Sequence, residues 1–148
     1  MTEPVEPIEI QLEVTCSAAH AFDTWANKTS TWWPPSHSMT SAPGLMVTFE
    51  PRQGGRIFER TSQGVEHDWG EVLAWEPPHR LAYLWHLGTD RSRATEVDIS
   101  FAGDAASTTV TIVHRGWDRL GTDADAWRQR NLGGWSGLLP HFRRAVAA

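Results

Sequence analysis

The chain has 148 residues, of which 40% are hydrophobic and 21% are charged, a balance typical of a globular protein rather than a disordered one. Its formal net charge of −5 disfavours a nucleic-acid partner, because phosphate backbones are bound by basic surfaces. The sequence holds no apolar run long enough to predict a membrane span.

The N-terminal segment MTEPVEPIE is acidic and lacks an apolar core, so it predicts no secretory signal. The lone Cys16 excludes a disulfide within the chain. We therefore expect a cytoplasmic protein that forms one domain over residues 1–148.

Residues 8–15 alternate between apolar and polar side chains, which is typical of a strand with one buried face. The segment SAAHAFDTWA that follows has apolar residues at helical spacing, with Ser17 as a candidate N-cap. Pro34 and Pro35 end helical structure here. We expect two short helices before a loop over residues 34–44 that is rich in Pro, Ser and Gly.

Short apolar segments separated by Gly- and Pro-rich turns then continue to residue 114. Their spacing and period of two predict an antiparallel sheet rather than alternating strands and helices. A loop is expected at residues 88–90. The predicted strands are Met46–Glu50, Arg56–Thr61, Trp69–Trp75, Arg80–Leu87, Thr95–Phe101 and Thr108–His114.

A long helix is predicted from Thr122 or Asp123 to the C-terminus, because acidic residues favour the first turn of a helix. Gly133, Gly134, Gly137 and Pro140 are poor residues for the interior of a helix, and we expect a kink near Pro140. The glycines either bring the helix close to the sheet or leave room for a ligand. Its apolar stripe consists of Trp127, Trp135, Leu138, Leu139, Phe142 and Val146.

About seven antiparallel strands and one long amphipathic helix predict an α+β fold. The helix is the only predicted element large enough to cover the apolar face of the sheet. We expect a curved sheet that grips the C-terminal helix and leaves a cavity between them.

Several motifs carry a resemblance to a known superfamily, and they extend from Ile8 to the C-terminal helix. They are Thr31-Trp32-Trp33-Pro34, Phe49 to Arg56, Trp69-Gly70-Glu71-Val72, Trp75 to Leu81, Tyr83-Leu84-Trp85, His114-Arg115-Gly116-Trp117 and Gly134-Trp135. In order and spacing they resemble the START-like, birch-allergen-like (SRPBCC) superfamily. Within it, the chain is most similar to homologues of the C-terminal domain of the heat shock protein 90 ATPase activator.

The resemblance implies a helix-grip fold with a hydrophobic cavity, but it does not fix the ligand. Members of the superfamily bind lipids, polyketides or plant hormones, and some cyclise them. The eukaryotic activator has a further N-terminal domain that makes much of the chaperone contact. We expect no such domain in this chain, which weakens the case for a chaperone role.

Nine tryptophans stand against a single tyrosine. Either they pack the core and its rim, or some of them line the cavity. Strand parity places Tyr83 and Trp85 on the inner face of the sheet, opposite Trp135 of the helix. We predict that Trp32, Trp33 and Trp117 lie at the rim of the cavity, where they would stack on a ligand or form a protein-binding patch.

Two polar side chains are expected to point inward. Parity carries His114 inward, either as a polar anchor for a ligand or as a core histidine. The parity of residues 56–61 is ambiguous, and the resemblance favours Ile57 and Glu59 inward. Since an unpaired buried carboxylate is costly, Glu59 is hypothesised to pair with His114; if it faces outward, a flanking arginine would screen it.

No metal-ligand spacing, nucleophile elbow or phosphate-binding loop is present, so we expect neither a metal nor a cofactor. The favoured function is binding of a small hydrophobic or aromatic ligand. The alternatives are a protein-interaction or co-chaperone-like module, and an enzyme with His114 and Glu59 as acid and base groups. The sequence does not indicate the oligomeric state. The predicted ligand-binding residues are Trp33, Ile57, Glu59, Trp69, Tyr83, Trp85, Val97, Ile99, Ile112, His114, Trp117, Trp135 and Leu139.

Overall fold

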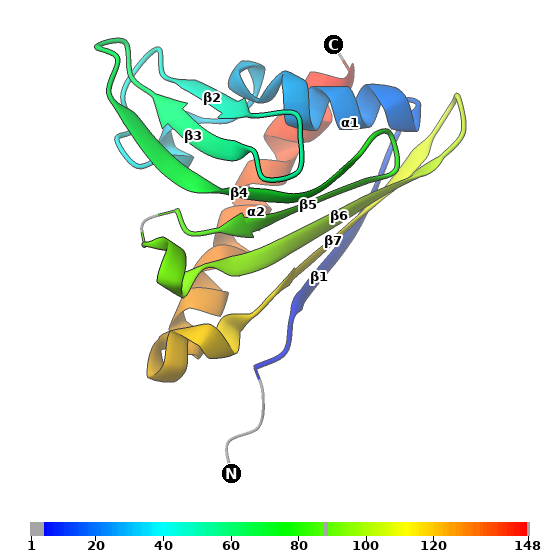
Figure 1. Cartoon of the computed structure of the whole chain (residues 1–148). Helices are drawn as coiled ribbons and strands as arrows, with labels where there is room; N and C mark the ends of the chain where they lie inside the picture. The colour runs from blue at the N-terminus through cyan, green and yellow to red at the C-terminus, as the bar shows by residue number, and fades with distance from the viewer. Residues whose placement is uncertain (1–4, 88, 148) are drawn as a thin grey trace.

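A seven-stranded antiparallel sheet curves around one long helix, α2 (Ala124–Ala147), which lies behind the sheet in the view of Figure 1. The computed structural model describes residues 5–87 and 89–147. The first four residues of the acidic N-terminal segment, and Gly88 of the predicted loop, lie outside the described residues. The α+β helix-grip fold predicted from the sequence is confirmed.

The strands follow the order β1-β7-β6-β5-β4-β3-β2 across the sheet, so the first strand pairs with the last. Every other neighbouring pair is consecutive in the sequence. The strands are β1 (Ile8–Val14), β2 (Met46–Phe49), β3 (Arg56–Arg60), β4 (Glu66–Glu76), β5 (Arg80–Trp85), β6 (Thr95–Gly103) and β7 (Thr108–Arg115).

The segment between β1 and β2 carries α1 (Ala18–Asn27), and its start follows the predicted cap: the Ser17 hydroxyl accepts a hydrogen bond from the His20 amide. Short 3-10 turns complete the chain. They are η1 (Thr29–Thr31), η2 (Pro35–His37), η3 (Arg91–Arg93) and η4 (Trp117–Asp123). None of the helices in the described part of the chain is long and apolar enough to cross a membrane.

Most predicted strand ends lie within two residues of the observed ones, and two of the differences have a clear physical reason. Strand β4 begins at Glu66 instead of Trp69, because its backbone pairs with β3 whatever side chains it carries there. Helix α2 begins at Ala124, after the 3-10 turn η4, which hydrophobic periodicity did not reveal. Neither the glycines nor Pro140 interrupts α2.

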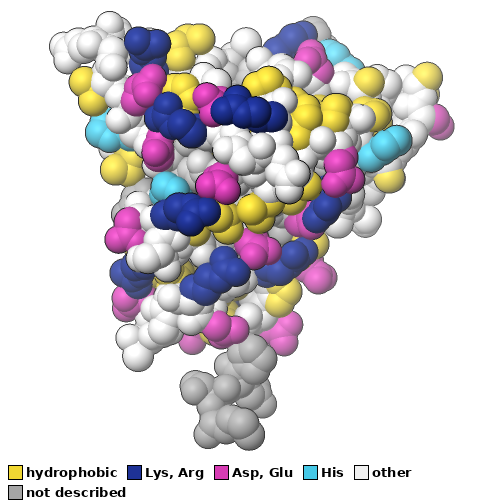
Figure 2. Space-filling view, viewed as in Figure 1, with side chains coloured by type: hydrophobic (Ala, Val, Ile, Leu, Met, Phe, Trp, Pro, Cys, Tyr) yellow, Lys and Arg dark blue, Asp and Glu magenta, His cyan; other side chains and the backbone are white. Residues whose placement is uncertain are grey.

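The inner and outer faces of the sheet follow strand parity. Ile57, Glu59, Tyr83 and His114 are each 0% exposed, so the inward orientation chosen for β3 is confirmed. The outer face shown in Figure 2 carries interspersed acidic and basic side chains. These form cross-strand ion pairs such as Arg80–Asp98, with 2.8 Å between Nη2 and Oδ2. Ion pairs that remain partly exposed to solvent contribute little to stability, so the burial of side chains on the inner face contributes most of it.

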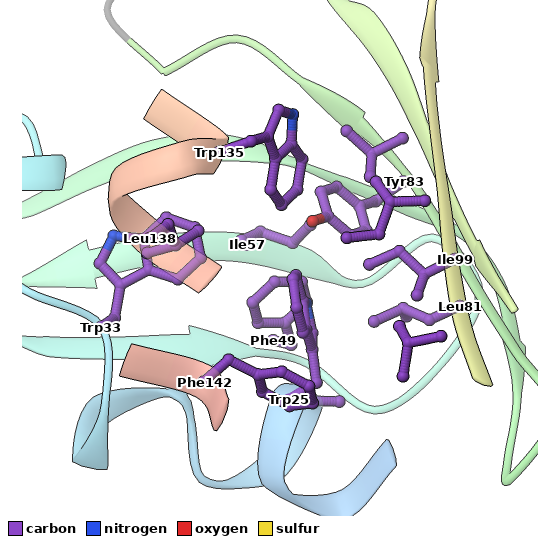
Figure 3. Packing of buried hydrophobic residues seen from close by; sticks show 14 of the residues in the cluster. Trp25, Trp33, Phe49, Ile57, Leu81, Tyr83, Ile99, Trp135, Leu138 and Phe142 are labelled. Atoms are coloured by element: carbon purple, nitrogen blue, oxygen red, sulfur yellow. The ribbon is translucent and has the colours of Figure 1, made fainter. Parts of the chain in front are cut away.

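Aromatic side chains from both helices meet the inner face of the sheet (Figure 3). The Trp25 ring lies 4.9 Å from Phe142 and 6.0 Å from Trp135, between ring centroids. Of the nine tryptophans, six are at most 6% exposed, so most of them form the core.

The predicted rim position of Trp32 and Trp117 is wrong, since they are 5% and 1% exposed. Each has a backbone acceptor for its indole N–H, at Thr24 O (2.8 Å) and His114 O (3.0 Å) respectively. A satisfied N–H removes the main cost of burying an indole.

We expect Phe142→Ala to lower the free energy of unfolding by about 3–5 kcal/mol, because it empties a fully buried position between aromatic rings. Exposed Arg144, two residues further along α2, provides the control. Arg144→Ala should stay within about 0.5 kcal/mol of the parent protein. Urea unfolding followed by circular dichroism checks both values; equal effects would contradict the position of Phe142 in the core.

Candidate functional site

A cavity of about 290 Å³ lies between α2, the end of β5 and the loop around η2. Four tryptophans contribute to its wall, together with apolar residues from three segments of the chain. The full lining is Trp33, Ser36, His37, Ser38, Met39, Trp85, Leu87, Trp127, Arg130, Asn131, Gly134, Trp135 and Leu138.

Hydrogen bonds hold two of the four indoles in place. Trp33 donates from Nε1 to the carbonyl of His37 (2.9 Å), and Trp135 donates from Nε1 to Nδ1 of His114 (3.1 Å). The Trp33 and Trp85 rings lie 5.8 Å apart at 51°. These rings form an apolar surface that is largely fixed before any ligand arrives, which reduces the entropic cost of binding.

The glycines of α2 shape the cavity from the helix side. No atom lies within 4 Å of the position that a Cβ of Gly134 would occupy, so this glycine leaves space within the lining. A Cβ at Gly137 would lie 3.3 Å from Nε2 of His37. The glycines thus admit the η2 loop and leave room for a ligand; close approach to the sheet is not their role at these two positions.

Glu59 of β3 supports the loop after η2, which forms part of the cavity wall. Its carboxylate accepts hydrogen bonds from the backbone amides of Met39 (2.5 Å) and Thr40 (3.3 Å) and from the Thr40 hydroxyl (2.7 Å). It also accepts one from Nε1 of Trp69 (2.8 Å). The buried carboxylate therefore fixes the loop that carries Ser38 and Met39.

The protonation of Glu59 follows from these contacts. Burial alone would raise its pKa, but the hydrogen bonds from Thr40, Met39 and Trp69 favour the ionised form and hold the pKa below its ordinary value. Glu59 thus stays charged without a cationic partner, because its charge is satisfied by donors.

His114 belongs to a chain of hydrogen bonds that joins α2 to the sheet. Since an indole N–H only donates, Nδ1 of His114 must accept from Trp135, and the ring proton sits on Nε2. Nε2 donates this proton to Thr95 Oγ1, with 2.6 Å between the two atoms, and the threonine hydroxyl in turn donates to Trp85 O at 3.3 Å. Burial lowers the pKa of His114 to about 3, so the imidazole is neutral.

The hypothesised pair between Glu59 and His114 is wrong. Each is satisfied by its own partners, because each side chain reaches donors or acceptors nearer to its own strand. Neither residue lines the cavity. Their geometry therefore gives no support to a role as acid and base groups on a bound substrate.

The structure brings together three of the predicted ligand-binding residues, Trp33, Trp85 and Trp135, in the cavity wall. Trp117 borders a separate hollow of about 20 Å³ next to it. The others lie outside both linings: Ile57, Glu59, Trp69, Tyr83, Val97, Ile99, Ile112, His114 and Leu139. Most of these fill the interior of the sheet, where inward parity leads into packed core before it reaches the cavity.

Sequence reasoning missed the loop residues of the lining. Trp127 and Leu138 were in the predicted apolar stripe of the helix, and that stripe was the available signal for them. His37 and Met39 lie in a Pro- and Ser-rich loop without periodicity, so no pattern indicated their position. Within residues 5–87 and 89–147, no group of three His, Cys, Asp or Glu side chains is arranged to hold a metal ion.

Residues 15–147 match the family model described as "Activator of Hsp90 ATPase homolog 1-like protein". No curated protein matches the sequence significantly. Among solved structures, the chain is similar to the anthrahydroquino-gamma-pyrone synthase Txn09, solved in complex with a ligand. The identity is 32%, the match covers 98% of this chain and 99% of the other, and the TM-score is 0.67.

A second similar structure is the self-sacrificing resistance protein CalC from Micromonospora echinospora, with 27% identity, coverage of 95% and 94%, and a TM-score of 0.71. A Bacillus halodurans protein shares the fold at 16% identity, with coverage of 98% and 99% and a TM-score of 0.68.

Glu59→Gln should loosen the loop after η2. A neutral amide is a weaker acceptor than a carboxylate, and its NH2 group would face the N–H and O–H donors of Met39, Thr40 and Trp69. We expect the free energy of unfolding to fall by about 2 kcal/mol, with faster hydrogen exchange at the amides of Met39 and Thr40. Glu66→Gln, at an exposed carboxylate on the neighbouring strand, serves as the control and should change neither. Unchanged exchange in Glu59→Gln would contradict the role assigned to this carboxylate.

His114 should make the protein less stable in acid. The unfolded chain binds a proton at this residue below pH 6.5, whereas the folded protein does so only near pH 3. Stability is therefore fully present above pH 6.5 and is lost as the pH falls between these values, by about 1.4 kcal/mol per pH unit.

Urea unfolding at several pH values should show this slope in the parent protein relative to His114→Gln. Ring ¹⁵N chemical shifts provide a check that does not depend on the variant. His114 should remain the neutral Nε2–H tautomer at pH 5. A titration of its ring near pH 6 would contradict the lowered pKa of this residue.

Proposed function

The chain belongs to the family of Activator of Hsp90 ATPase homolog 1-like proteins, and from that premise we propose that it binds a small planar aromatic molecule in the tryptophan-walled cavity. The observation that carries this proposal is the convergence of Trp33, Trp85, Trp127 and Trp135 on one cavity. Indole faces favour stacked or tilted contacts with other aromatic rings, beyond the gain from buried area.

The dimensions of the cavity favour a compact ligand. Its volume of about 290 Å³ lies at the lower end of the range for small-molecule sites, about 300–1,000 Å³. The interior behind Trp33 and Trp135 is filled by core side chains such as Phe142 and Tyr83. A fused-ring molecule suits this space better than an extended lipid chain.

The similar structures agree with a ligand-binding role. Txn09 is described as a pyrone synthase and was solved with a bound molecule, and it aligns with this chain over nearly the full length of both. A protein of the same fold that was solved in complex with a molecule supports a ligand-binding role for this chain.

The alternative of a protein-interaction module drew on the family resemblance and on an expected cluster of exposed tryptophans. Trp32, Trp33 and Trp117 are all at most 6% exposed, so these residues form no such patch. The half-exposed indoles of Trp85 and Trp127 line the cavity instead. The distribution of tryptophans therefore favours a small ligand.

Two adjacent glycines allow a matched test of the proposal. A Cβ at either Gly133 or Gly134 meets no atom within 4 Å, but only Gly134 lines the cavity. Leucine at either position should improve helix propensity to a similar degree, by up to about 1 kcal/mol. Gly134→Leu should fill the cavity, whereas Gly133→Leu should leave it open.

We expect the neutral probe 2-naphthamide to shift the indole ¹⁵N–¹H signals of Trp33, Trp85, Trp127 and Trp135 in the parent protein. Gly134→Leu should weaken the binding of this probe at least about tenfold, which corresponds to about 1.4 kcal/mol of binding free energy. Gly133→Leu should leave the affinity unchanged. Equal binding to both variants, or shifts confined to indoles outside the cavity, would overturn the proposal.

A further inference from the structure

From the charges around the cavity we infer that it selects aromatic molecules that carry an acidic group, and that Arg130 binds this group at the cavity mouth. The inference rests on the proposed function, since it specifies which aromatic ligands the same cavity accepts. Three observations support it: the charge of the cavity lining, the absence of an ion pair at Arg130 among the described residues, and the position of this side chain beside Trp127.

Among the residues that the structure describes, none that lines the cavity is acidic, although the chain is acidic overall. Asp and Glu number 18 against 13 Lys and Arg, but no carboxylate is among the lining residues. The charged side chain of the lining is Arg130. The remaining polar lining groups belong to Ser36, His37, Ser38 and Asn131, none of which carries a fixed negative charge.

Arg130 makes no ion pair with a carboxylate in the described part of the chain, whereas neighbouring arginines are engaged. Arg93 pairs with Asp123 at 3.0 Å, and Arg128 donates to the carbonyls of Glu6 (2.6 Å) and Pro7 (3.2 Å). The guanidinium of Arg130 lies over the Trp127 ring, 4.9 Å from its centroid. This contact positions the cation but leaves its five N–H donors available.

The position of Arg130 beside Trp127 suits a ligand with an apolar body and one acidic end. The body would lie among the tryptophans while its carboxylate meets the guanidinium, whose planar fork matches a carboxylate in two parallel hydrogen bonds. Because Arg130 is exposed, the acidic end stays near water and avoids the full cost of desolvation.

The net charge of −5 opposes an anion only weakly at this site. Fields of exposed charges are screened over about 8 Å at physiological salt, and many carboxylates of the chain are already paired with arginines. The interaction of an acidic ligand group with the unpaired Arg130 guanidinium therefore outweighs the repulsion from the net negative charge. The positive charge of Arg130 also repels a cationic ligand.

The test compares three probes of similar shape and different charge: 2-naphthoate, 2-naphthamide and 2-naphthylmethylammonium. Binding is measured by NMR titration of the tryptophan indole signals at pH 7.5 in 0.15 M salt. In the parent protein, naphthoate should bind most tightly and the ammonium compound most weakly. Arg130→Met should weaken naphthoate about tenfold and leave the amide within about twofold, because it removes charge-assisted bonds but keeps an apolar side chain.

Arg144→Met is the matched control, since Arg144 is an exposed arginine of the same helix outside the cavity lining. It should change the affinity of none of the three probes. Equal binding of all three to the parent protein, or an unchanged ratio of naphthoate to amide in Arg130→Met, would overturn this inference and leave the aromatic cavity intact. Failure of every naphthalene probe to bind would instead overturn the proposed function itself.

Discussion

The hydrogen bond from Trp135 to His114 joins helix α2 to the inner face of the sheet, and the arrangement of the cavity wall depends on it. It joins the middle of the helix to the last strand, 21 residues earlier in the sequence. Because the indole can only donate, it also determines the tautomer of His114, which extends the chain of hydrogen bonds to Thr95 and the carbonyl of Trp85. One helix, three strands and two walls of the cavity are thereby set relative to one another.

Glu59 plays the corresponding part on the other side of the cavity. A carboxylate with 0% exposure needs several donors, and the loop after η2 supplies three of them through Met39 and Thr40. The loop thus takes its shape from a charge that it buries. Both polar side chains that looked like ligand contacts are supports of the cavity wall, because full burial commits their polar atoms to the protein.

The charges of the molecule are distributed according to face. On the outer face of the sheet, acidic and basic side chains are interspersed and pair across strands. Within residues 5–87 and 89–147, Arg130 is the one charged side chain of the cavity lining. An unpaired cation beside four indoles distinguishes this surface from the rest of the molecule. The cavity therefore combines an apolar body with one polar end, as sites for small ligands commonly do.

The sequence by itself determined the class of fold, the inner faces of β1, β5, β6 and β7 and the apolar stripe of the helix, because period-two and helical patterns reflect burial directly. Parity and the family resemblance together placed Ile57, Glu59, Tyr83 and His114 on the inside, where they lie. Motifs spread along the chain were sufficient to indicate the family. Three of the tryptophans of the cavity, Trp33, Trp85 and Trp135, were also predicted as members of one site.

Only the tertiary structure decided which of the inward residues face a cavity and which are packed in the core. Periodicity says which side of a strand is buried, but it does not say what lies opposite, so Trp69 and Trp85 look alike in the sequence. Two partners of Glu59, Met39 and Thr40, lie 20 and 19 residues away in an irregular loop. The partners of His114 lie on another strand and on the helix. Such contacts arise when the chain closes on itself, and no local pattern records them.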